Sequence, residues 1–136
     1  NGTFASNSRL GTYASGSIPA NGKWYKIIEN LDAINIFEVV ATACGEVNSG
    51  NYSALHAIAL STFGGSKSRS KIKVLNAYWS GFGFLGKIFS KRKIKIRWGG
   101  TLHNYFLEMK TSGDWEINNK TSKPYQVKFN ITRLNI

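Results

Sequence analysis

The stretch Lys93-Ile94-Lys95-Ile96-Arg97-Trp98 alternates cations with apolar residues and decides the fold class. Successive side chains of a β-strand point to opposite faces, so this stretch has one apolar face and one cationic face. Lys71-Ile72-Lys73-Val74 follows the same rhythm, and Val127-Lys128-Phe129-Asn130-Ile131 repeats the pattern near the C-terminus. We therefore expect each segment to be a strand that buries its apolar side chains and exposes its cations.

About eight short strands are expected, because turn sequences separate the segments that have this period of two residues. Their ranges are 24–28, 34–43, 55–63, 72–79, 91–98, 104–110, 114–117 and 125–134. The nearly continuous apolar run at 34–43 predicts burial on both sides at its centre. No segment has a convincing helical period. Short strands at this spacing predict an all-β fold, either a sandwich or a barrel.

The length of 136 residues fits a single domain. Residues 1–22 are rich in Gly, Ser, Ala and Asn, with isolated Phe4, Leu10, Tyr13 and Ile18. This composition predicts an extended arm or linker at 1–22, followed by the β-domain at 23–136. Because the chain begins at Asn1 without Met, it resembles a fragment or a processed product.

The chain is strongly basic, with 18 Lys and Arg against 7 Asp and Glu and a formal net charge of +11. Such an excess attracts nucleic acids, acidic polysaccharides, lipopolysaccharide cores and anionic membranes. The same charge could also serve only to solvate the outer strand faces. No apolar run reaches the roughly 18 residues of a membrane helix, so membrane insertion is not expected.

Little in the sequence indicates catalysis. Cys44 is the single cysteine, which excludes a disulfide framework within the chain and a cysteine zinc site. His56 and His103 lie apart, without the further ligands that a metal would need. Asp114 and Glu116 share one face of a short predicted strand, as a glycosidase pair would, but a solvated edge is the preferred interpretation. We expect no cofactor, no metal and no enzymatic activity.

Aromatic residues alternate with glycine in Tyr78-Trp79-Ser80-Gly81-Phe82-Gly83-Phe84, and cations flank this segment. Aromatic faces beside cations suit the binding of a sugar or a nucleobase. Alternatively, these rings pack onto the core or into a subunit interface. Trp98 could serve either purpose, because it shares its parity with Ile96. The predicted ligand-binding residues are Lys71, Lys73, Trp79, Phe82, Lys93, Lys95 and Arg97.

The order of strand motifs resembles the C-terminal β-sandwich head modules of phage tail fibres and phage-derived adhesins. The resemblance rests on Gly22-Lys23-Trp24-Tyr25-Lys26-Ile27 after a Gly/Ser-rich approach, on Ile94-Lys95-Ile96-Arg97, and on Asn104-Tyr105-Phe106-Leu107-Glu108-Met109. It covers about residues 23–134, and the insert at 79–93 has no counterpart in it. The resemblance implies an antiparallel β-sandwich of jelly-roll type and a homotrimer. It implies no catalytic residues.

The preferred interpretation is a non-enzymatic receptor-binding or structural module of a phage tail fibre-like protein. It would recognise a bacterial surface glycan or another anionic polymer, and it would lie on a virion or in the extracellular space. One alternative is a basic nucleic-acid-binding β-domain, for which affinity would fall steeply with salt. The other alternative is a polysaccharide-degrading enzyme.

Overall fold

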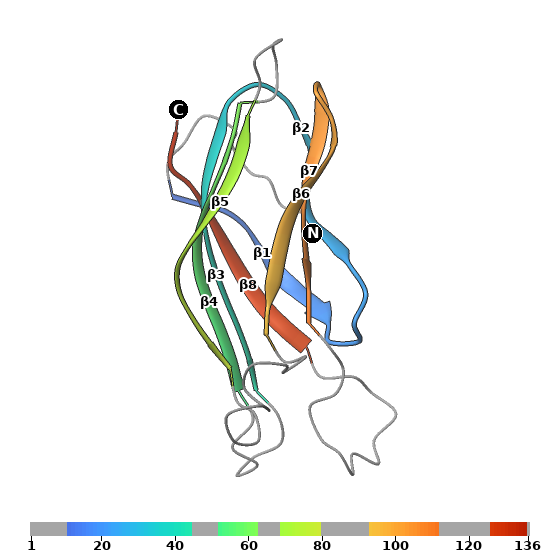
Figure 1. Ribbon diagram of the computed structural model, residues 1–136, viewed down its shortest axis with the longest axis vertical. Helices are drawn as coiled ribbons and strands as arrows, with labels where there is room; N and C mark the ends of the chain where they lie inside the picture. Colours follow the sequence, from blue (N-terminus) through green and yellow to red (C-terminus); the bar gives the residue numbers. More distant parts are fainter. Residues whose placement is uncertain (1–10, 45–51, 63–68, 80–92, 112–125, 136) are drawn as a thin grey trace.

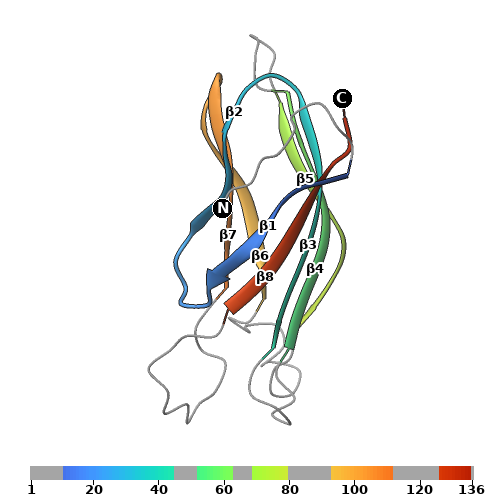
Figure 2. The same ribbon diagram turned by 180° about the vertical axis from the view of Figure 1, so that it is seen from behind.

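Eight antiparallel strands form two sheets in the computed structural model, which describes residues 11–44, 52–62, 69–79, 93–111 and 126–135. The five-stranded sheet has the order β1-β8-β3-β4-β5, and the three-stranded sheet has the order β2-β7-β6. Figures 1 and 2 show the two sheets as the layers of a sandwich. The strands are β1 (Gly11–Pro19), β2 (Tyr25–Leu31), β3 (Asn35–Cys44), β4 (Tyr52–Ser61), β5 (Ser70–Trp79), β6 (Lys95–Thr101), β7 (Asn104–Lys110) and β8 (Gln126–Arg133).

The topology confirms the predicted all-β antiparallel sandwich of about eight strands. The ends of the chain nest as in a jelly roll, with β1 beside β8 in one sheet and β2 beside β7 in the other. Strands β3, β4 and β5 form a meander, and β8 returns to lie beside β3. This is the 4-1-2-3 order of a Greek key, with β6 and β7 placed in the long connection.

Most predicted strands appear within a few residues of their expected bounds, and β7 matches its prediction at 104–110. The predicted strand at 114–117 lies outside the described residues. The eighth observed strand is instead β1, within the predicted extended arm at 1–22. Residues 11–19 are thus a strand of the sandwich and not a free linker, and the boundary between arm and domain at residue 22 remains a prediction.

Small residues let β1 pack against β8, which is why its composition resembles a linker. Gly16 lies opposite Phe129 in the register of the two strands. A Cβ atom at Gly16 would stand 3.3 Å from Cζ of that ring, closer than ordinary van der Waals contact. The absence of a side chain at Gly16 therefore makes room for the Phe129 ring.

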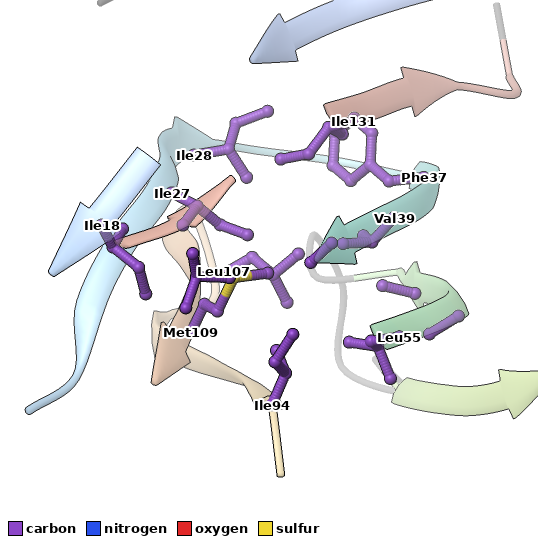
Figure 3. Close-up of a cluster of buried hydrophobic side chains, with 14 of the residues drawn as sticks. Ile18, Ile27, Ile28, Phe37, Val39, Leu55, Ile94, Leu107, Met109 and Ile131 are labelled. Carbon is purple, nitrogen blue, oxygen red and sulfur yellow. The ribbon is translucent and has the colours of Figure 1, made fainter. Parts of the chain in front are cut away.

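The core lies between the two sheets and is built from alternate residues of each strand. One cluster of buried hydrophobic side chains contains Phe37 and Val39 of β3, Leu107 and Met109 of β7 and Ile131 of β8, as Figure 3 shows. In β4 the residues with odd numbers from 53 to 61 are buried, and those between them are half-buried. The strand at 35–44 follows the same alternation, so its predicted burial on both sides is wrong. Its outward-facing Val40 is 43% exposed, because no second layer among the described residues covers that face.

The predicted separation of apolar and cationic side chains holds in part. Ile94, Val127 and Ile131 are buried, while Ile72, Ile96 and Phe129 are partly buried against the core. Of the predicted outward cations, Lys71, Lys73, Lys95 and Lys128 are exposed, and Lys93 is half-buried.

Val74 is 50% exposed, contrary to prediction. It lies on an edge strand, and the register of β4 and β5 shifts there, with Ala57 opposite Val74 and His56 opposite Asn76. The shift leaves Leu75 as an extra residue in β5, which is the geometry of a β-bulge and interrupts the alternation of faces.

A buried polar network fixes the crossing from the three-stranded to the five-stranded sheet. The Tyr105 hydroxyl donates a hydrogen bond to the Ala33 carbonyl at 2.7 Å and accepts one from Asn35 Nδ2 at 2.6 Å. The same amide group of Asn35 donates to the carbonyl of Asp32 at 2.9 Å. Asn35 is buried, so these bonds offset the cost of removing its amide from water. They tie the β2–β3 connection to β7.

The inner faces should dominate stability. Replacing Ile131, which is fully buried, with Ala should lower the free energy of unfolding by about 2–5 kcal/mol, through lost transfer energy and a cavity. Truncating Val74 to Ala is the matched control and should change it by about 0.5 kcal/mol or less, because that side chain is half-exposed. Urea denaturation measures both. Equal losses would contradict the burial of Ile131 and the exposure of Val74.

Candidate functional site

The outer face of the three-stranded sheet carries cations from all three strands, and we call it the basic face. Strand register places Lys26, Glu108 and Arg97 in one row across β2, β7 and β6. The next row pairs Lys110 with Lys95. These positions alternate with half-buried residues along β6 and with buried residues along β7, so the alternation that builds the core also gathers the cations. The basic face consists of Lys26, Lys95, Arg97, Glu108 and Lys110, together with Trp24 and Phe106.

Trp24 holds two of these cations in place. The guanidinium carbon of Arg97 lies 4.0 Å from the centroid of the Trp24 ring, and Lys110 Nζ lies 4.9 Å from it. Arg97 Nε also donates a hydrogen bond to Glu108 Oε1 at 2.8 Å. Cation–π contact and ion pairing each contribute modestly at an exposed site. Together they orient the Arg97 side chain, so that less conformational entropy would be lost if it bound an anion.

Phe106 forms the second aromatic contact of the basic face. Its ring covers Gly99, where a Cβ atom would stand only 2.7 Å from the ring. Lys26 Nζ lies 4.5 Å from the centroid of the same ring. Gly99 is thus required by close packing, which lets the ring lie on the sheet with a cation above it.

Lys95 and Lys110 face one another directly across β6 and β7. Like charges in this relation destabilise a sheet. An anion bound between the two strands would relieve the repulsion.

The structure separates the predicted binding residues into three places. Lys95 and Arg97 lie on the basic face. Lys71 and Lys73 lie on the outer face of the five-stranded sheet, because Ile72 between them packs toward the core. The two outer faces point away from each other, so these four cations do not form one surface.

The remaining predicted residues lie away from both groups. Lys93 Nζ lies 4.9 Å from the Trp79 ring centroid, at the end of β5. Phe82 lies outside the described residues. Trp98 faces the core, where its ring meets Tyr105 edge-on at 5.4 Å between centroids. Of its two possible roles, packing is the one that the structure shows.

Sequence reasoning missed Trp24, Lys26, Phe106 and Lys110 as members of the basic face. A signal was present, because Phe106-Leu107-Glu108-Met109-Lys110 alternates polar or aromatic with buried residues, and Trp24 and Lys26 have the same spacing. What brought these residues together was the pairing of β2 with β7, which joins segments about eighty residues apart.

The described residues offer little for metal or acid–base chemistry. They contain no group of three or more His, Cys, Asp or Glu side chains that could hold a metal ion. His56 Nε2 lies 2.6 Å from Glu38 Oε2, and His103 Nδ1 lies 3.0 Å from Asp32 Oδ1. The hydrogen bond with His103 and that from the Ala33 amide hold the pKa of Asp32 below its ordinary value. The predicted carboxylate pair Asp114 and Glu116 lies outside the described residues.

No helix that could cross a membrane occurs in the described part of the chain.

Comparisons with known proteins give weak similarity, and only to solved structures. No protein-family model matches the chain, and no curated protein matches it. Among solved structures it is similar to the tailspike protein of Acinetobacter baumannii phage AM24, with 8% sequence identity and a TM-score of 0.46. The similarity covers 90% of this chain and 25% of the tailspike chain, so this chain spans about a quarter of the tailspike's length.

Two charge-neutralising variants of β6 should separate repulsive from stabilising contacts. Lys95→Gln removes the repulsion with Lys110, so the free energy of unfolding should stay unchanged or rise by about 0.2–1 kcal/mol. Arg97→Gln removes the Trp24 stack and the Glu108 pair, so it should lower the free energy by about 1 kcal/mol. Urea denaturation at low salt measures both. Equal destabilisation by the two variants would contradict the contacts described.

Proposed function

We propose that the basic face binds an anionic polymer, and that its natural ligand is a bacterial surface glycan carrying acidic groups. The observation that carries this proposal is the set of cations gathered from β2, β6 and β7 and oriented by Trp24 and Phe106. Such a surface attracts and steers polyanions. The resemblance of the strand motifs to phage tail-fibre heads supports a receptor-binding or structural module without catalytic activity, carried on a virion or in the extracellular space.

The arrangement of the aromatic rings favours a glycan over a nucleic acid. Proteins that bind single strands without sequence preference stack successive bases on aromatic faces. On the basic face, Arg97 and Lys110 lie over the Trp24 ring, and Lys26 lies over the Phe106 ring. These rings hold cations and are not open platforms for bases. Anionic groups would therefore be recognised mainly by charge and hydrogen bonding.

Binding to heparin, used as a generic anionic polysaccharide, tests this proposal across a salt series. The double variant Lys95→Gln/Lys110→Gln should bind more weakly. If both lysines contact anionic groups, the slope of log affinity against log salt should flatten by about one to two. Lys71→Gln/Lys73→Gln removes the same charge from the opposite face and should bind almost as tightly as the original chain. Equal effects of the two double variants would show only a general charge effect and would contradict the proposal. Tighter binding to single-stranded DNA than to heparin would favour the nucleic-acid alternative.

We further propose that the chain forms a homotrimer, as the tail-fibre resemblance implies. The outer face of the five-stranded sheet supports self-association, because Val40 and Tyr78 are exposed there and Glu38 and Lys73 provide charges of both signs. Sedimentation equilibrium should give about three times the chain mass of 15.1 kDa. Val40→Lys should shift the equilibrium toward the monomer, because it places a charge in an apolar contact. A chain that stays monomeric at high micromolar concentration would contradict this proposal.

A further inference from the structure

The sandwich has two lateral edges, and they differ in how they are closed. At one edge, Trp98 Nε1 of β6 donates a hydrogen bond to the Lys71 carbonyl of β5 at 3.3 Å. Strand β5 also carries a register shift and the charged side chains Lys71 and Lys73, which are features that protect an edge strand from further pairing. At this edge a hydrogen bond joins the two sheets, and β5 is protected from pairing with a further strand.

At the other edge, between β1 and β2, a groove of about 480 Å³ opens between the sheets. Figure 2 shows these two strands on the same side of the sandwich. The volume of this groove lies within the range of small-ligand sites. We call it the edge groove, and it is lined by Ala14, Ser15, Gly16, Ser17, Ile18, Lys26, Ile27, Ile28, Glu29 and Phe129.

Phe129 provides the edge groove with an aromatic surface. Val127 and Ile131, on the same strand and the same face, are fully buried, whereas Phe129 is only partly buried. The difference arises because β1 presents small residues beside the ring, with Gly16 directly opposite. An aromatic ring that is partly open to solvent offers the apolar surface against which the C–H face of a sugar ring can pack.

The rim of the groove is polar without being strongly cationic. Glu29 lines one wall. Ser15 and Ser17 belong to the other wall, but they pair with the outward-facing Asn130 and Lys128, so they border the groove through their backbone. Both walls are edge strands, whose backbone N–H and C=O groups can bond to sugar hydroxyls. Lys26 Nζ is held over Phe106 on the basic face. The rim thus matches the hydroxyl groups of a neutral sugar better than a carboxylate or sulfate.

We propose that the edge groove binds one or two neutral sugar units, with Phe129 as the packing surface and Glu29 and the strand edges as hydrogen-bonding partners. An added peptide strand fits the groove less well. Strand β1 has a register shift between Thr12 and Ala14 and ends at Pro19, so regular pairing could extend over only 14–18. Strand β2 is interrupted by register shifts between Lys26 and Ile28 and between Ile28 and Leu31. This second site is independent of the proposed anion-binding function.

Amide chemical-shift mapping of the full chain with neutral trisaccharides of glucose, galactose, mannose and N-acetylglucosamine tests the proposal. At least one should cause saturable shifts at 14–18 and 26–29. The affinity should be nearly the same in roughly 20 mM and 500 mM NaCl, since no ion pair is involved. Lys95→Gln/Lys110→Gln should bind this sugar normally, which separates this site from the basic face.

Two variants address the groove itself. Gly16→Ala places a methyl group against the ring, and Phe129→Leu removes the ring, so each should weaken sugar binding by about tenfold or more. The control Asn130→Ala changes the neighbouring residue, which is exposed on the outer face, and should bind like the original chain. Native-like amide spectra establish that each variant is folded. Shifts confined to other regions, no shifts with any trisaccharide, or unchanged affinity in folded Gly16→Ala and Phe129→Leu would overturn the proposal. A peptide of alternating Thr and Val that shifts 14–18 when no sugar does would also overturn it.

Discussion

Three strands pack against five, and this inequality shapes the rest of the described structure. A sheet gains stability by burying one face, and the smaller sheet cannot cover the full width of the larger one. The centre of the sandwich is therefore closed over Phe37, Val39 and Leu107. Toward the edges, Val74 stays exposed and Phe129 is only partly covered. The core and the edge groove are consequences of the same geometry.

The two-layer arrangement also determines how the positive charge is distributed. Most strand cations lie on the outer face of their sheet, so those of the two sheets point in opposite directions. Arg133 of β8 is an exception, because it lies opposite the buried Phe37. Lys71 and Lys73 belong to one outer face, and Lys95 and Arg97 belong to the other. A flat ligand meets the cations of only one sheet. The net charge of +11 is therefore a poor guide to the strength of either surface taken alone.

The aromatic residues outside the core orient charged side chains on the three-stranded sheet. Trp24 holds Arg97 and Lys110, and Phe106 holds Lys26 while lying over Gly99. Lys95 and Lys110 are paired across β6 and β7, and like charges in this relation lower the stability of a sheet. These oriented cations and the opposed lysines are the observations on which the proposed anion-binding role rests.

The sequence by itself determined the fold class and the inner face of most strands, because alternation with a period of two is local information that each strand carries independently. It located β7 and showed that Ile94, Val127 and Ile131 are buried. Only the tertiary structure decided that β1 joins the sandwich, since the need for a small residue at Gly16 arises from its contact with the Phe129 ring. It also decided which cations share a face and that Trp24 meets Arg97. Those contacts depend on which strands pair and on where a bulge shifts the register. The sequence of one segment does not specify which distant segment it pairs with.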